Sequence, residues 1–180
     1  MRFMSVSRLA IFLGAGLVLS MGVLSAQGLT NRRAPSFSLP DSNLRQYDIL
    51  DYRGSWLLLG FIGTDSQESK DLSKKLESVK AKFGSKVGIL SVLISPPETQ
   101  ATAAKYVSVT KITTPILFDS GQVAIAYFKA TPQKPNFDQP HLFAINPNGL
   151  IVKEWSQATM QAPGFLNEVT QLVGGSPAKK

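Results

Sequence analysis

The sequence predicts an α/β fold in which a mixed central sheet carries helices on both faces and ends in a β-hairpin followed by a helix. Three observations predict it. Two apolar segments, residues 56–62 and 87–94, are typical of central strands buried on both faces. Apolar residues at helical spacing follow the first segment. An Asn-Gly turn joins two apolar segments near the C-terminus, which is typical of a hairpin. Strands that alternate with helices indicate one layered domain.

The elements of the first half follow from the positions of apolar residues. Residues 31–43 contain two prolines and are predicted to be a linker-like arm, and residues 45–50 a short strand. A buried strand over 56–62 leads into a helix of about five turns, for which Gly84 is the expected stop. The apolar face of that helix consists of Leu72, Leu76, Val79 and Phe83.

The second half continues the alternation, and glycine, proline and asparagine residues separate its elements. In chain order the pattern predicts a strand over 87–94, a helix over 98–109, a strand over 115–118, a helix over 121–129, a loop over 131–139, a hairpin of strands 141–145 and 150–155, and a closing helix over 163–173. The domain is therefore expected to span residues 27–173, with a flexible tail over 174–180.

The N-terminus is typical of an export leader. Arg2 and Arg8 precede an apolar run over residues 9–24, and Ser25-Ala26 offers small residues for cleavage. The run is shorter than the roughly 20 residues of a membrane-spanning helix. Residues 1–26 are therefore expected to be a signal peptide, with an uncleaved membrane anchor as the alternative. Either prediction places the domain outside the cytoplasm, in the periplasm or its equivalent.

Composition excludes several classes of function. The chain has 180 residues and no cysteine, so it holds no disulfide, no thiolate metal site and no thiol nucleophile. No nucleotide-binding or zinc-binding motif occurs, and we expect neither a cofactor nor a metal. The net charge of +7 comes from scattered lysines without interleaved aromatic residues. Nucleic acid is therefore not an expected partner.

Five fragments in the same order and spacing resemble the thioredoxin-like redoxin group, which includes the AhpC/TSA and TlpA-type proteins. They are residues 33–41 (RAPSFSLPD), 50–56 (LDYRGSW), 59–66 (LGFIGTDS), 114–119 (TPILFD) and 140–149 (PHLFAINPNG). The resemblance implies a thioredoxin-like fold over most of the chain. It also implies that Pro140 is the family's cis-proline, whose loop pairs in working relatives with an extended substrate.

The redox motif of that group is altered in this chain. The resemblance places Ser66 and Ser69 at the two positions of the Cys-x-x-Cys pair. Disulfide exchange needs a thiolate, and a serine hydroxyl neither ionises near neutral pH nor forms disulfides. Asp65 and Glu68 add negative charge beside these positions, which would raise the pKa of a neighbouring thiol.

The same segment supports two other interpretations. Thr64 and Gln67 fit a capping box at the start of the long helix, and this is the favoured role of the segment. Alternatively, Ser66 could act as a nucleophile with His141, the sole histidine, as base, and Asp65 or Asp138 as orienting carboxylate.

The leading hypothesis is a cysteine-free redoxin-like protein of the cell envelope that binds or scaffolds other molecules rather than catalysing a reaction. Its expected partners are envelope proteins or extended peptides at the Pro140 edge. Three alternatives stay open. One is a thiol-disulfide oxidoreductase or antioxidant, which rests on family assignment only, and another is a Ser-His hydrolase. The third is a chaperone or partner of an envelope redox system that docks through the Pro140 edge and the basic helix.

Overall fold

The computed structural model describes residues 29–94, 99–131 and 138–175, and its centre is a six-stranded sheet with the strand order β1-β8-β7-β4-β5-β6. The strands are β1 (Arg32–Arg33), β4 (Trp56–Ile62), β5 (Val87–Leu93), β6 (Ile116–Phe118), β7 (His141–Ile145) and β8 (Leu150–Trp155). Strand β4 pairs in parallel with β5 and antiparallel with β7. The predicted mixed sheet is therefore confirmed.

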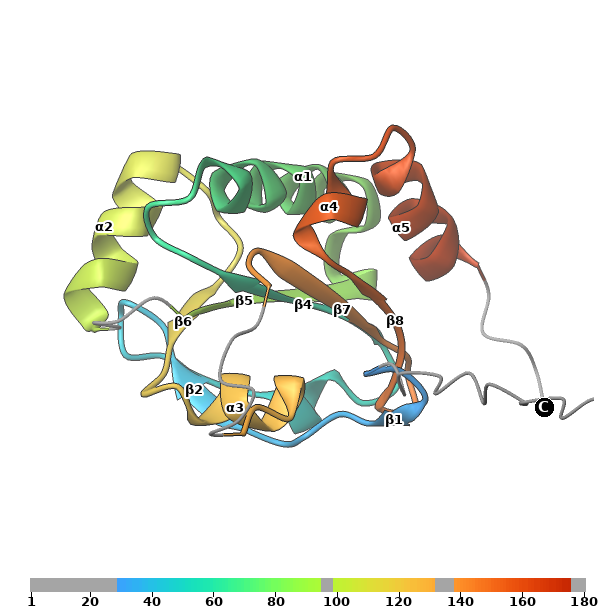
Figure 1. Ribbon diagram of the computed structural model, residues 1–180, viewed down its shortest axis with the longest axis horizontal. Coiled ribbons are helices and arrows are strands. Elements are labelled where there is room, and N and C mark those ends of the chain that lie inside the picture. Colours follow the sequence, from blue (N-terminus) through green and yellow to red (C-terminus); the bar gives the residue numbers. More distant parts are fainter. Residues whose placement is uncertain (1–28, 95–98, 132–137, 176–180) are drawn as a thin grey trace, which may run out of the picture.

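Helices cover both faces of the sheet (Figure 1). One face carries α1 (Gln67–Phe83), α2 (Gln100–Thr110), α4 (Gln157–Met160) and α5 (Phe165–Gly174). The opposite face carries α3 (Gln122–Phe128) and a small antiparallel sheet of β2 (Ser38–Pro40) and β3 (Gln46–Asp48). The fold is thus a three-layer sandwich with its sheet in the middle.

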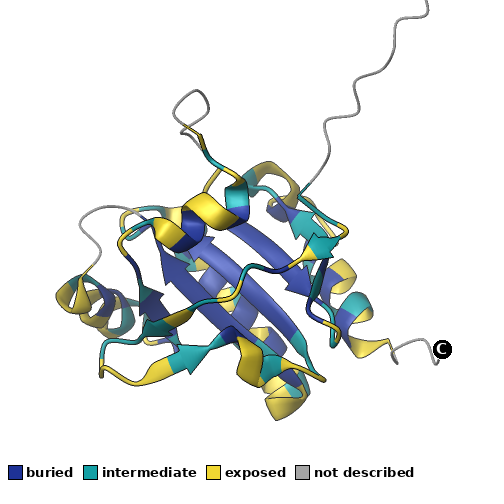
Figure 2. Cartoon of the chain, turned by 90° about the horizontal axis from the view of Figure 1, so that it is seen from below, coloured by how far each residue is buried: buried dark blue, intermediate teal, exposed yellow. Residues whose placement is uncertain are grey.

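The central strands are buried on both faces because their side chains alternate between two cores. From β4, Leu58 and Ile62 pack among the helices on the α1 face, while Leu57, Leu59 and Phe61 pack on the α3 face. Figure 2 shows these strands as a buried band between outer elements that are largely exposed. This double burial explains the continuous apolar segment that predicted the strand.

Three predicted elements agree with the structure to the residue. They are β4 and the two hairpin strands, β7 and β8. Gly84 ends α1 as expected, with a φ of 57°, and its backbone N–H donates to the Lys80 carbonyl. The hairpin turn is held by the Asn146 side chain, which accepts from the backbone N–H groups of Asn148 and Leu150.

The N-terminal prediction needs correction. Residues 31–43 are not a linker throughout, because they contain β1 and β2. These strands are two and three residues long, too short to show an alternating pattern, and tertiary pairing defines them. The strand predicted over 45–50 is limited to β3, and a 3₁₀ helix, η1 (Ile49–Tyr52), follows because the Asp48 side chain caps it through the Leu50 N–H.

Helix boundaries also differ from prediction. The short helix α4 was not predicted, since four residues carry no measurable period. Helix α5 begins two residues later than expected and ends one residue later. It follows Gly164, which has a φ of 99°. Helix α2 begins at Gln100, where Thr99 and Thr102 form a capping box.

The leader predicted over residues 1–26 and the tail beyond Gly175 lie outside the described residues. In the part of the chain that the structure describes, no helix has the length and apolar character needed to cross a membrane.

Candidate functional site

Ser66 lies at the point where β4 has ended and α1 begins. It is the N-cap of α1: its hydroxyl oxygen accepts a 3.1 Å hydrogen bond from the Ser69 N–H. The same hydroxyl donates to Glu68 Oε2 at 2.9 Å. The hydroxyl therefore acts as both donor and acceptor within the first turn of the helix.

Ser69 points inward and is fully buried. Its hydroxyl oxygen accepts a 3.0 Å hydrogen bond from the Gly63 N–H, which joins the end of β4 to the helix. One turn further, the Ser73 hydroxyl donates to the Ser69 carbonyl and contacts the Tyr106 hydroxyl at 2.9 Å. A partly exposed Ser66 and a buried Ser69 thus hold the start of α1 against the sheet.

The predicted capping box at Thr64 and Gln67 is wrong. The cap is Ser66, two residues later, and Gln67 is the first residue of the helix. The Gln67 side chain donates to Asp71 Oδ1 at 2.9 Å instead of bonding back to Thr64. Both Thr64 and Ser66 are good caps by residue type, and only the path of the chain out of β4 selects between them.

Pro140 lies near the first turns of α1, at the start of β7. Its peptide bond with Gln139 is cis, and Pro140 directly precedes β7. Pro140 and the first turns of α1 line one cavity of about 270 Å³, together with α4. The full lining is Gln67, Glu68, Asp71, Leu72, Lys75, Pro140, Gln157, Met160 and Gln161. Gln67 and Glu68, which lie between the two serines, therefore share one cavity with Pro140.

The cavity combines an apolar lining with carboxylates. Leu72, Met160 and Pro140 supply the apolar part. Glu68 and Asp71 supply two carboxylates, and the pKa of Glu68 is lowered because its own backbone N–H and the Ser66 hydroxyl donate to it. Among the described residues, neither carboxylate takes part in a salt bridge.

Lys75 is the one basic residue of that lining, and it is already engaged. Its ammonium donates to the Met160 carbonyl at 2.9 Å and lies 5.3 Å from the centre of the Phe165 ring. These contacts tie α1 to the C-terminal helices. Among the described residues, Lys75 forms no salt bridge with either carboxylate of the cavity.

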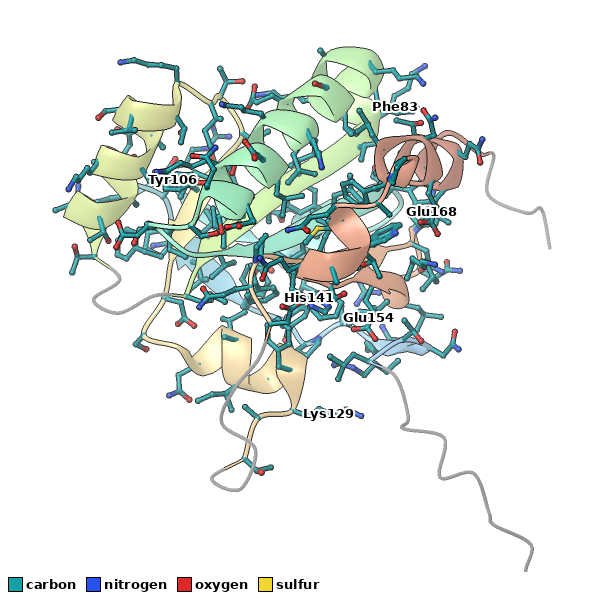
Figure 3. The ribbon with its side chains drawn as sticks, turned by 45° about the horizontal axis from the view of Figure 1, so that its top comes forward. Phe83, Tyr106, Lys129, His141, Glu154 and Glu168 are labelled. Carbon is teal, nitrogen blue, oxygen red and sulfur yellow. The ribbon has the colours of Figure 1, made fainter. Side chains whose placement is uncertain are left out.

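His141 begins β7 and packs on the α3 face of the sheet, between the rings of Phe128 and Phe143 at 5.0 and 4.7 Å. Its Nε2 lies 3.1 Å from Glu154 Oε2, and Figure 3 shows the two side chains together. Nδ1 lies 4.0 Å from Asp138 Oδ2 and is buried without a hydrogen bond. Burial lowers the pKa of His141, and the neighbouring carboxylates offset this only in part.

Ser66 and His141 are not brought together as a nucleophile and its base. Each has other partners, Glu68 and the Ser69 N–H for the serine, Glu154 for the histidine. Of the two carboxylates expected to orient the histidine, Asp138 does lie beside it, whereas Asp65 is exposed. Within the described ranges, no group of three or more potential metal ligands comes together.

Two features of this region were missed by sequence reasoning. One is α4, which forms a wall of the cavity. The other is Glu154, whose Oε1 also accepts the backbone N–H of Leu29 at 3.1 Å, so that it links His141 to the N-terminal arm. Its position in a predicted strand, directly before the apolar Trp155, could have indicated a partly buried carboxylate.

Comparison with known proteins supplies the family. The model of the AhpC/TSA family matches residues 30–154, which is most of the described chain. This protein belongs to the AhpC/TSA family. The expected membership in the thioredoxin-like redoxin group is thereby confirmed, and this family member contains no cysteine.

Individual relatives are distant. The thiol-disulfide oxidoreductase ResA of Bacillus thuringiensis is 23% identical over 141 residues, which cover 77% of this chain and 78% of ResA. The thioredoxin domain of a thiol-disulfide oxidoreductase of Bacteroides vulgatus superposes with a TM-score of 0.64 at 17% identity, covering 80% of this chain and 97% of that domain. A secreted disulfide oxidoreductase of Mycobacterium tuberculosis superposes with a TM-score of 0.59 at 16% identity. The match covers 77% of this chain and 94% of that protein. These matches confirm the thioredoxin-like fold.

Proposed function

We propose that this family member is a polypeptide-binding module that retains the docking side of the redoxin fold without its thiol chemistry. The observation that carries the proposal is the cavity shared by Pro140, the first turns of α1 and α4. It lies beside the two serines that replace the redox pair, and the hydroxyls of both serines are engaged in holding α1. The cavity can therefore accept a segment of another polypeptide, although the neighbouring serines lack redox reactivity.

The chemistry of the cavity indicates what kind of segment would fit. An apolar lining of Leu72, Met160 and Pro140 suits the aliphatic stem of a side chain. The carboxylates of Glu68 and Asp71 suit a cationic end group. An extended polypeptide that carries lysine or arginine supplies both features, whereas an acidic segment would be repelled.

A hydrolase is less well supported. Serine catalysis requires an effective base within hydrogen-bond reach of the nucleophile. Ser66 donates to Glu68, whose lowered pKa makes it a weak base, and His141 contacts Glu154 instead. A thiol-disulfide oxidoreductase needs a thiol, and this chain has no cysteine to supply one. Binding is the function that uses the groups present.

We further propose that the protein acts outside the cytoplasm. The apolar run over residues 9–24, preceded by two arginines, supports export. The similar Mycobacterium tuberculosis protein is itself described as secreted. Sequencing the N-terminus of the mature protein from an envelope fraction tests this, and a chain that starts at Met1 would argue against a cleaved leader.

Binding can be tested with a short fluorescein-labelled peptide of alternating threonine and lysine, titrated with the purified mature chain and followed by fluorescence anisotropy. We expect saturable binding, and weaker binding when glutamate replaces the lysines. Gln161→Trp should block the cavity and weaken binding. Gln171→Trp is the matched control, because Gln171 is equally exposed but lies on α5 outside the cavity lining.

The proposal fails if the lysine peptide does not bind, or if both tryptophan variants bind it as the unmodified chain does. Turnover in an insulin-reduction or peroxide-consumption assay above that of a denatured control would overturn it in favour of a redox activity. Labelling of Ser66 by a fluorophosphonate probe, lost in Ser66→Ala, would instead support the hydrolase.

A further inference from the structure

We propose that His141 is a proton-dependent switch that controls the start of α4, and through it the cavity beside Pro140. The biological meaning of this switch rests on the proposed docking function, but the switch itself is a property of the fold. Three contacts connect the imidazole to α4. They are His141 to Glu154, His141 to Asp138, and Asp138 to the backbone of α4.

The tautomer of neutral His141 follows from its partner. An ionised carboxylate can only accept a hydrogen bond, so Nε2 carries the hydrogen that it donates to Glu154 Oε2 at 3.1 Å. Nδ1 is then a bare lone pair. It is buried, has no hydrogen bond, and faces Asp138 Oδ2 at 4.0 Å. Nδ1 and Asp138 Oδ2 are therefore both acceptors, and no hydrogen bond can form between them while His141 is neutral.

Asp138 has a second role. Its Oδ2 accepts the backbone N–H of Gln157 at 2.5 Å, at the first residue of α4. Gln157 and Met160 of that helix line the cavity. One carboxylate oxygen thus contacts both the helix that forms the cavity wall and the imidazole that lacks a partner.

Protonation of His141 changes this balance. Nδ1 gains a hydrogen and the ring gains a positive charge, so Asp138 Oδ2 becomes its nearest acceptor. A hydrogen bond between the imidazolium and the Asp138 carboxylate adds an attraction between two full charges, which the bond from the neutral Gln157 amide lacks. We infer that Asp138 then moves toward His141 and releases the Gln157 N–H, which loosens the first turn of α4.

The charged surroundings of His141 set the pH at which this happens. Glu154 on β8 and Asp138 before β7 both favour the imidazolium, and Arg32 on β1 interacts electrostatically with Glu154. Helix α3 contributes the uncharged Phe128 ring, and Lys129 behind it is exposed and points away (Figure 3). Burial has the largest effect and places the transition below the ordinary histidine pKa of 6.5.

The chain has only one histidine, so its ring signals can be followed by NMR without ambiguity. The experiment titrates the mature protein from about pH 7.5 to about pH 5, or lower while it stays folded. It records the imidazole carbons of His141 and the backbone amide of Gln157. We expect the Gln157 amide proton to move upfield with the same midpoint as the His141 ring.

Asp138→Asn is the informative variant, because asparagine can still accept the Gln157 N–H but has no charge to attract an imidazolium. We expect the histidine midpoint to fall and the Gln157 amide to stop following it. Asp51→Asn, at an exposed position, is the matched control and should leave both unchanged. A Gln157 amide that ignores the His141 titration, or that follows it equally in Asp138→Asn, would disprove the switch. So would a His141 that remains neutral until the protein unfolds.

Peptide binding separates this inference from the proposed function. The threonine-lysine peptide should bind about threefold to tenfold more weakly once His141 is protonated, as expected for loss of one hydrogen bond in the cavity wall. Asp138→Asn should show a smaller change. If the peptide binds at no pH while the Gln157 amide still follows His141, the docking function is wrong and the switch stands. Binding that does not change across the transition would show that the switch does not control the cavity.

Discussion

The hydroxyl of Ser66 donates to the carboxylate of Glu68 two residues later, at 2.9 Å, while its oxygen accepts the Ser69 N–H. The resemblance to redoxins implies that Ser66 takes the position of their nucleophilic thiolate, and Ser66 lies in direct contact with a negative charge. A thiolate is stabilised by nearby positive charge and helix N-termini and destabilised by a nearby carboxylate. The first turn of α1 is arranged for a hydroxyl donor rather than for an anion.

Restoring the thiols tests this arrangement. In Ser66→Cys/Ser69→Cys, replacing Glu68 by glutamine should lower the pKa of the thiol introduced at position 66 by about half to one unit, because the nearest negative charge is removed. The pKa is measured from the ultraviolet absorbance of the thiolate as a function of pH. Asp51→Asn in the same background is the control. A thiol pKa that is unchanged or rises in the Glu68→Gln background would contradict the prediction.

Loss of the cap should destabilise the protein. Ser66→Ala removes the acceptor of the Ser69 N–H at the start of α1, and we expect the free energy of unfolding to fall by about 1 kcal/mol. Urea denaturation measures it. Thr64→Ala is the matched control and should change stability by less than about 0.5 kcal/mol. A larger loss of stability in Thr64→Ala than in Ser66→Ala would instead support the capping box inferred from the sequence.

Gly88 lies under the ring of Tyr52. A Cβ at this position would lie 2.1 Å from Tyr52 Cδ1, so the ring must move. We expect Gly88→Ala to lower the free energy of unfolding by about 1–3 kcal/mol, the usual cost of overpacking. In a Tyr52→Ala background the same substitution should cost much less, and a double-mutant cycle gives the coupling. Additive effects would show that the ring is not the obstacle.

The C-terminal helix should depend on pH through Glu168. Its Oε1 lies 2.8 Å from Lys153 Nζ, and its Oε2 accepts from Trp155 Nε1 at 2.7 Å. These two partners lower the pKa of Glu168 below its ordinary value of 4.5. A carboxylate whose folded pKa is depressed stabilises the protein fully above the unfolded pKa, and this contribution is lost as the pH falls through the folded value.

The difference in melting temperature between the unmodified chain and Glu168→Gln should therefore be constant near neutral pH and should shrink in acid. Thermal unfolding followed by circular dichroism at several pH values measures it. Lys153→Gln should shift the loss to higher pH, because the pKa of Glu168 rises when its cation is removed. A difference that grows in acid would have the wrong sign for this pair.

Much of the fold could be predicted from the sequence, because the central strands are continuous apolar segments and the long helix has apolar residues at helical spacing. The segment 56–62 had to be buried on both faces, and Gly84 could end α1 at a positive φ that other residues rarely adopt. The Asn-Gly turn likewise determined the hairpin. The absence of cysteine by itself excludes disulfide exchange by this chain, whatever its fold.

Other features were decided only by tertiary structure. Strand β1 exists because β8 offers it a partner, and α4 is too short to show a period. Ser66 rather than Thr64 caps α1 because of the direction in which the chain leaves β4, and the sequence does not show that direction. The neighbours of His141 come from residues 13 positions ahead and three behind, brought together by the pairing of β7 with β8. Local patterns reflect local backbone geometry, whereas contacts between distant segments depend on how the layers pack.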